Sequence, residues 1–375
     1  MAIHSSTALT LSEEQAMLMG VANEFCRDKS PIDVVREHLE SSSGYPETVW
    51  EEMIALGWTG IALPESVGGS ALGVGALVPV VEAMGRVMLA TPLISSTLAG
   101  QLLQRLGQPS RVEGWLAGIA EGTIATVALL ENGDWGSDRI TTTLSNDGVL
   151  QGSKFMVPDV GVAELLLVPC LRDGETVIVV LRTEQVTSDA FASNVLIDET
   201  KRSANVALDG VQVAEDAVLE GDAVRAALRD VRLLGALLVA AEATGSAYSC
   251  LATVVEYLNT RKQFGKLIGS YQALKHPAVD ILCGTDSARS LIYHAATVVG
   301  ESSLDRDAEI ACRMAKAHAA ENLEYAGDRA VQFHGGMGFT YECDAQLYIR
   351  RAQWARQQFG DSQHHRKHLA TLLLD

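Results

Sequence analysis

The chain has 375 residues, of which 47% are hydrophobic and 20% are charged, and its formal net charge at pH 7 is −18. This composition favours a folded, helix-rich globular protein of two or three domains over a disordered chain. The negative charge disfavours a broad nucleic-acid surface, because such a surface needs an excess of lysine and arginine. We therefore expect no nucleic-acid partner.

The sequence carries no clear membrane, disulfide or metal signal. No apolar run approaches the roughly 18 to 20 residues that span a bilayer, and the N-terminal MAIHSSTALTLSEEQ lacks the basic and apolar regions of a signal peptide. The six cysteines include no CxxC pair, so they predict neither a zinc site nor a disulfide framework. We expect a cytoplasmic protein with no membrane segment, no metal and six free thiols.

The first part of the chain, residues 1–118, is predicted to form a helical domain. Ser12 is a plausible N-cap with Gln15 at the capping-box distance. Later segments such as PETVWEEMIALGW and VGALVPVVEAMGRVMLA repeat apolar residues at a spacing of three and four.

Residues 119–222 change to short β-rich runs separated by turn signals, which predicts a small antiparallel β domain. The SNDG at 145–148 indicates a hairpin. Residues 223–375 are helical again, with long segments near 223–260, 270–300, 305–334 and 342–358. These segments suggest an antiparallel four-helix bundle, so the predicted fold is α+β in the order helices, strands, bundle.

Two motifs in the last domain suggest chemistry. In RKQFG, Arg261 either satisfies a helix C-terminus or binds phosphate oxygens through its planar guanidinium. In QFHGGMG, the bare Gly335 and Gly336 indicate either a helix-to-helix turn or a close approach of backbone to a ligand.

Taken together, these motifs resemble those of the flavin-dependent acyl-CoA dehydrogenases. The resemblance covers the full length, through GWTGIALPESVGG and EAMGR in the first domain, RKQFGKLIGSYQ in the third, and QFHGGMGFTYECD near the end. The segments TPLISSTLAG, DETKR and RRAQ are most similar to the actinobacterial branch of that family.

The resemblance implies a tetramer in which the FAD of each subunit also contacts its neighbour. In the family, the RxxFG and QxxGG elements of one chain surround the adenine and diphosphate of a flavin whose ring lies in the next subunit. Six positions match this pattern: Arg261, Phe264, Gln272, Gln332, Gly335 and Gly336. The family also implies an acyl-CoA substrate and an electron-transfer flavoprotein as electron acceptor.

The ring-binding part of the pattern is less well preserved. It corresponds to residues 129–139 and 154–159, where Gly136, Ser137 and Asp138 match the family loop. A family threonine is replaced by Leu130, and KFMVPD offers no hydroxyl. Backbone donors remain available to hold the ring, with Ser137 as the matching side chain.

The glutamate that usually acts as the base in this family is missing. Counting along the chain places Phe359 at the position used by medium-chain enzymes and Gly235 at the position used by isovaleryl-type enzymes. Glu242 lies two helical turns after Gly235 on nearly the same face. It is either a catalytic base whose pKa is raised by apolar neighbours, or a partly exposed residue or one paired with an arginine.

Other polar residues near the end of the chain are weaker candidates. Asp361 and the adjacent His364 and His365 read equally well as the start of a solvated helix, and adjacent histidines make a poor metal pair. The small residues around Gly235 leave room for a bulky acyl group, or simply reflect tight helix packing.

Three functions remain open. The first is a dehydrogenase that makes an α,β-unsaturated thioester with Glu242 as the base. The second is a non-catalytic subunit that contributes FAD-binding residues to a catalytic partner in a heterotetramer. The third is a relative with oxidase or monooxygenase chemistry.

Overall fold

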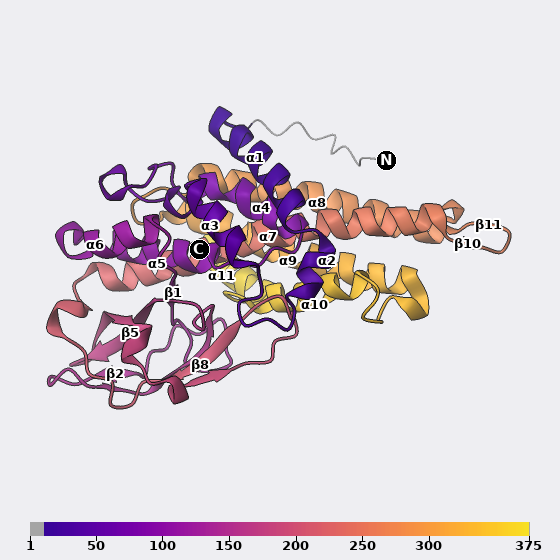
Figure 1. Cartoon of the computed structure of the whole chain (residues 1–375). Coiled ribbons are helices and arrows are strands. Elements are labelled where there is room, and N and C mark those ends of the chain that lie inside the picture. The colour runs from indigo at the N-terminus through magenta and orange to yellow at the C-terminus, as the bar shows by residue number, and fades with distance from the viewer. Residues whose placement is uncertain (1–10, 375) are drawn as a thin grey trace.

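The computed structural model describes residues 11–374. Residues 1–10, which include most of the stretch in which we expect no signal peptide, lie outside the described part, as does residue 375. In the described part, helices precede a β domain, and a second set of helices follows it (Figure 1).

The N-terminal domain is helical, as predicted. Its helices are α1 (Glu13–Lys29), α2 (Ile32–Glu37), α3 (Glu47–Ala55), α4 (Val78–Arg86), α5 (Leu93–Arg105) and α6 (Pro109–Ala120). The predicted capping box is confirmed, since the Ser12 hydroxyl accepts the N–H of Gln15 and the Gln15 side chain accepts the N–H of Ser12.

The middle domain contains two sheets. Its strands are β1 (Ala125–Val127), β2 (Thr143–Leu144), β3 (Leu150–Gln151), β4 (Ser153–Pro158), β5 (Leu165–Arg172), β6 (Glu175–Arg182), β7 (Phe191–Ser193), β8 (Ser203–Ala207) and β9 (Val218–Leu219). One sheet has the order β3-β2-β5-β6-β9 with β1 also paired to β5, and the other has the order β4-β8-β7.

The predicted hairpin is confirmed, because β2 and β3 pair antiparallel across the SNDG turn. The other pairs of the predicted antiparallel domain are mostly antiparallel as well, but two pairs are parallel. Both β1 and β2 run parallel to β5, since the chain crosses over between these strands instead of turning back directly, and turn signals do not reveal such crossovers.

The C-terminal domain contains the four predicted helices and a fifth. They are α7 (Ala223–Thr260), α8 (Gln272–Val298), α9 (Arg306–His334), α10 (Ala345–Gln357) and α11 (Ser362–Leu374). Small residues in α7 allow close packing on α4: a Cβ atom on Gly245 would lie 2.0 Å from the Glu82 carbonyl oxygen, and one on Gly85 would lie 2.1 Å from the Glu242 carbonyl oxygen. The small residues after Gly235, namely Ala236, Ala240, Ala241 and Ala243, are 0–1% exposed and are therefore packed against neighbouring segments.

Helix α7 is the one helix among residues 11–374 that is long and apolar enough to span a membrane by length and composition. The apolar window of α7 is 72% buried inside the protein. It is thus the central helix of the bundle, in contact with α4, α5, α8, α9 and α10. All six cysteines are free, and Cys283 alone among them is exposed.

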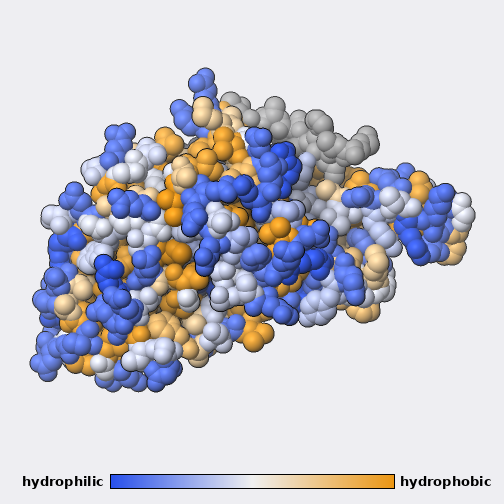
Figure 2. All heavy atoms as spheres, in the orientation of Figure 1, coloured by the Kyte–Doolittle hydropathy of each residue, from blue (hydrophilic) through white to orange (hydrophobic). Residues whose placement is uncertain are grey.

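The long helices separate two regions, the β domain and the hairpin that follows α7, which lie at opposite ends of the bundle. Figure 1 shows the β domain against one end of the bundle, and the hairpin β10 (Lys262–Gln263) and β11 (Lys266–Leu267) at the opposite end, where α7 and α8 project. In Figure 2 that projecting end is largely hydrophilic.

Candidate functional site

The six residues predicted to contact a neighbour's flavin lie at the projecting end of the bundle. Arg261 follows the last residue of α7, Phe264 lies in the β10–β11 turn and Gln272 begins α8. Gln332 lies in the last turn of α9, and Gly335 and Gly336 follow it. Phe264 is 89% exposed, and Arg261, Gln272, Gln332, Gly335 and Gly336 are exposed as well. We call these six residues the distal cluster.

Gly335 and Gly336 differ in whether the structure of this chain explains a glycine at the position. Gly335 has φ of +62°, which favours glycine where α9 ends. Gly336 does not have a positive φ, and no atom lies within 4 Å of a Cβ built on it. Neither conformation nor packing within the described chain explains a bare backbone at Gly336, which is consistent with approach of a ligand or a second chain.

The two usual base positions meet in the interior. A Cβ atom on Gly235 would lie 2.4 Å from Cζ of Phe359, so the Phe359 ring packs directly over Gly235. Phe359 has φ of +56° and stands between α10 and α11. The structure therefore brings together the positions that the sequence identified, and neither of them carries a carboxylate.

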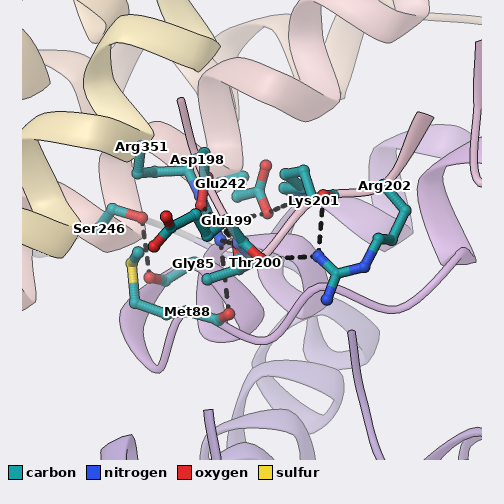
Figure 3. Close-up of polar contacts among 10 residues, drawn as sticks. All are labelled: Gly85, Met88, Asp198, Glu199, Thr200, Lys201, Arg202, Glu242, Ser246 and Arg351. Atoms are coloured by element: carbon teal, nitrogen blue, oxygen red, sulfur yellow. Dashed lines mark hydrogen bonds and ion pairs between the residues drawn. The ribbon is translucent and has the colours of Figure 1, made fainter. Parts of the chain in front are cut away.

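Glu242 lies in a buried ion-pair cluster. Its side chain is 1% exposed, and its Oε1 is 2.6 Å from Nζ of Lys201 and 3.0 Å from a guanidinium nitrogen of Arg351. Arg351 is also paired with Asp198, and it donates to the Thr200 hydroxyl at 2.6 Å. Figure 3 shows Asp198, Glu242 and Arg351 directed toward one another.

This cluster bears on the proposed role of Glu242. The carboxylate is not unpaired as a free base would be, and it does not line the cavities beside Phe359. The geometry matches the alternative interpretation, in which Glu242 is paired with an arginine. Oε2 of Glu242 has no hydrogen-bond partner among the described residues, and this orphaned atom is the remaining feature of the residue that packing does not explain.

The region predicted to hold the flavin ring is nearly closed. Trp135, Met156 and Phe359 together line two small cavities of about 60 Å³ and about 40 Å³, whereas pockets for small ligands usually have about 300–1,000 Å³. The backbone donors there are already in use. The N–H of Phe155 donates to the Leu130 carbonyl at 2.8 Å, and the N–H of Met156 donates to Oδ1 of Asn205 at 2.9 Å.

Ser137 lies in the predicted loop but does not line these cavities. Its hydroxyl accepts the N–H of Arg139 at 3.3 Å and thereby shapes the loop. The loop is anchored by Glu131, which lies 2.5 Å from the buried ammonium group of Lys154. That ammonium group, together with bonds from Thr141 and Thr142, lowers the pKa of Glu131 to about 2 despite burial.

A larger cavity of about 500 Å³ opens on the other side of Phe359. Its basic lining comes from the start of α7, from α9 and from α11: Arg225, Arg229, Arg232, Arg313, His364, His365 and His368. In a chain of net charge −18, the four arginines make this cavity suited to an anion.

Some charged and polar side chains that line this basic cavity lack an ion-pair or hydrogen-bond partner among the described residues. Among the described residues Arg232 has no ion-pair partner, and its guanidinium donates a hydrogen bond to the Leu129 carbonyl at 3.3 Å. Burial lowers the pKa of Arg232, with only Asp138 opposing that shift. Neither ring nitrogen of the buried His365 makes a hydrogen bond of standard geometry within residues 11–374. Burial and the charges of Lys316 and Arg313 lower its pKa to about 2, although the nearby Gly360 backbone opposes that shift.

The sequence reasoning did not find this cavity, because its residues are far apart along the chain. It also did not single out Asp159, which lines the 60 Å³ cavity and accepts a hydrogen bond from Ser95. Burial raises the pKa of Asp159 to about 6. Ser95 and Asp159 are 64 residues apart in the sequence, so the surroundings that raise this pKa exist only in the folded chain.

No group of three or more histidine, cysteine, aspartate or glutamate residues in the described range 11–374 is placed to hold a metal ion. The rings of His364 and His365 are perpendicular with centroids 5.2 Å apart.

The comparisons with known proteins agree with this architecture. Residues 12–123 match the acyl-CoA dehydrogenase N-terminal domain, and residues 225–374 match the acyl-CoA dehydrogenase C-terminal domain. The acyl-CoA dehydrogenase IpdE2 of Mycolicibacterium smegmatis is 28% identical over 93% of this chain and 96% of its own length.

Two solved structures are also similar. The ChsE4-ChsE5 complex from Mycobacterium tuberculosis has a chain with TM-score 0.86 and 24% identity, covering 98% of both chains, which shows the shared fold. A variant of the Tcur3481-Tcur3483 steroid ACAD has TM-score 0.84 and 26% identity, covering 97% of this chain and 99% of that one.

The fold and the site define a flavin-dependent oxidoreductase built from a helical domain, a β domain and a helical bundle. The chain belongs to the acyl-CoA dehydrogenase family, whose members use FAD and act on the CH–CH bond of an acyl-CoA.

Proposed function

We propose that this chain is the FAD-supporting subunit of a heteromeric acyl-CoA dehydrogenase. The observation that carries the proposal is the packing of Phe359 on Gly235, because both usual base positions lie in the interior without a carboxylate. The nearest glutamate on α7, Glu242, is held by Arg351 and Lys201. A phenyl ring cannot accept the proton that the reaction removes.

The distal cluster supports a role toward a neighbour. Its exposed guanidinium at Arg261 and the open backbone at Gly336 fit the diphosphate and adenine of FAD. The cluster lies at the opposite end of the bundle from the β domain of the same chain (Figure 1). These residues are therefore available to an FAD that is held mainly by a partner.

FAD bound there would accept the hydride in the partner's active site. This chain would bind and orient the nucleotide end of the cofactor through Arg261, Gln272 and Gln332 and through the backbone at Gly335 and Gly336. Its own flavin-ring region, with cavities of about 60 Å³ and 40 Å³, is too small for the ring.

A second candidate function is catalysis by this chain itself, and the basic cavity of about 500 Å³ favours it. Arginines beside an apolar wall suit the phosphates and pantetheine of a CoA thioester. In that case Phe359 and Trp135 would have to move to admit the flavin ring and the acyl group, and Glu242 would have to leave its arginine to act as base.

We further propose an acyl-CoA substrate for the assembled enzyme, a heterotetrameric assembly, a cytoplasmic location and an electron-transfer flavoprotein as electron acceptor. Each of the two similar solved proteins is named as a pair, ChsE4-ChsE5 and Tcur3481-Tcur3483. The second pair is called a steroid ACAD. A bulky polycyclic acyl group is therefore our proposed substrate class for the partner's site.

The decisive experiment compares the chain expressed alone with the chain co-expressed with a second acyl-CoA dehydrogenase subunit that carries the base. We expect the chain alone to retain little flavin and to show no ferrocenium-coupled acyl-CoA oxidation, and the complex to hold flavin and turn over. Full flavin and turnover in the chain alone would reject the supporting role and favour the second candidate.

A further inference from the structure

The distal cluster is assembled from separate parts of the chain. Arg261 ends α7, whereas Gly335 and Gly336 follow α9. A single FAD can contact both only if the ends of these two helices keep a fixed separation. The contact that joins the two ends is therefore part of the binding geometry.

That contact is an aromatic stack. The ring of His334, the last residue of α9, stacks on the ring of Tyr257 in α7, with centroids 4.1 Å apart and planes inclined by 25°. The carbonyl oxygen of the same Tyr257 accepts the backbone N–H of Arg261 at 3.0 Å. The stack thus connects the residue before Gly335 to the last turn of α7, which holds the backbone of the arginine.

The orientation of His334 is fixed from both sides. The residue is 7% exposed, and its Nδ1 lies 2.7 Å from the carbonyl oxygen of Ala330, one turn earlier in α9. Gly335 then turns the chain through a conformation with positive φ. His334 is thus held at the point where α9 ends and the Gly335–Gly336 segment begins.

We propose that His334 is a positioning residue for the FAD of the neighbouring subunit. By stacking on Tyr257 it sets the distance between the Arg261 guanidinium and the open backbone of Gly335 and Gly336. His334 itself need not touch the cofactor. The inference rests on the proposed function for the identity of the ligand. It adds the residue that keeps Arg261 at a fixed distance from Gly335 and Gly336.

Helix α9 offers a matched control. His318 is a second histidine of the same helix, and its Nε2 lies 3.2 Å from the Gly284 carbonyl oxygen of α8. It also makes a ring-to-carbonyl contact, here to another helix, but lies about four turns from the distal cluster. A substitution at His318 measures how much FAD affinity changes when a histidine of α9 far from the distal cluster is altered.

The test uses the heteromeric complex carrying His334→Ala, His334→Leu, His334→Phe or His318→Ala in this chain. Assembly is followed by gel filtration, and FAD affinity by quenching of flavin fluorescence. We expect assembly to persist in all four, FAD affinity to fall about tenfold in His334→Ala and His334→Leu, and His334→Phe to recover most of it through the stack. His318→Ala should retain the unmodified affinity.

Unchanged FAD affinity in His334→Ala would overturn the inference, and so would a His334→Phe complex as weak as His334→Leu. If His334→Ala does not accumulate, the FAD affinities of His334→Leu and His334→Phe decide the matter. Both side chains fill the volume of the histidine, but only phenylalanine can stack on Tyr257. Arg261→Gln separates the two proposals. If it also leaves FAD affinity unchanged, the distal cluster does not reach the cofactor and the supporting role itself fails.

Discussion

Gly235 and Phe359 are in direct contact: a Cβ atom on Gly235 would lie 2.4 Å from Cζ of Phe359. The ring therefore occupies the place that any larger residue at position 235 would need. Gly235 also lies inside α7, where the backbone is helical, so steric exclusion by the ring is the local reason for a glycine at this position.

Gly235→Ala should destabilise the chain by about 1–3 kcal/mol through overpacking. Phe359→Leu in the same chain should recover part of that loss, because the two substitutions share one contact. Chemical denaturation of the single and double variants measures the coupling. Gly114→Ala in α6 is the control, since nothing lies within 4 Å of its Cβ, and it should be neutral or stabilising. Additive effects of the two interior changes would contradict the contact.

Glu242→Gln should weaken the interdomain ion-pair cluster rather than abolish the reaction. We expect a loss of about 1–3 kcal/mol in the free energy of unfolding, because the buried Arg351 loses one of its two carboxylate partners. Turnover of the assembled enzyme should fall by less than about threefold, whereas loss of a general base costs roughly 10²–10⁴-fold. Glu256→Gln, on a partly exposed face of α7, is the control. A hundredfold loss of turnover at unchanged stability would identify Glu242 as the base.

Gly336→Ala and Gly338→Ala should separate ligand binding from folding. A Cβ on Gly336 has no neighbour within 4 Å, whereas one on Gly338 would lie 2.3 Å from the Val331 carbonyl oxygen. Gly336→Ala should leave the thermal stability of the isolated chain unchanged and lower the flavin content of the complex. Gly338→Ala should lower the stability of the chain itself. Equal losses of stability in both would show that Gly336 also has an internal packing role.

Asp159 should make stability decrease as pH rises. Its folded pKa is about 6, above the value of about 3.9 for an unfolded aspartate. Its contribution is therefore fully present below about pH 4 and is lost as pH rises through about 6. Asp159→Asn should stabilise the chain at about pH 8 by about 1–3 kcal/mol relative to its effect at about pH 4. Denaturation midpoints at the two pH values measure this, and a pH-independent difference would contradict it.

The histidines of the basic cavity should couple anion binding to protonation. The pKa of His364 and that of His368 both lie below the usual histidine value, because of burial and of the positive charge of Arg313 among other groups. Bound pyrophosphate should favour the protonated forms, so its affinity should increase several-fold between about pH 7 and pH 5. Calorimetric titration tests this, with the double variant His364→Gln, His368→Gln expected to show a flatter pH dependence. The same slope in that variant would exclude the histidines.

The sequence predicted the class of fold because local patterns specify it. Apolar spacing of three and four defined the long helices, and the capping box at Ser12 marked where α1 begins. The motif residues of the distal cluster and the absence of a carboxylate at positions 235 and 359 could also be read by counting. The parallel pairing of β1 and β2 with β5 could not, because strand direction depends on crossovers that leave no local signal.

What the sequence by itself determined, then, is the family fold, and from it come the residues that we propose for FAD. Only the tertiary structure decided how they can be used. It pairs Glu242 with Arg351 across the bundle, places Phe359 over Gly235, and gathers arginines of α7 and α9 and histidines of α11 into one cavity. Periodicity fixes the face on which a side chain lies, but the partner on that face is set by the packing of distant segments, which sequence spacing does not encode.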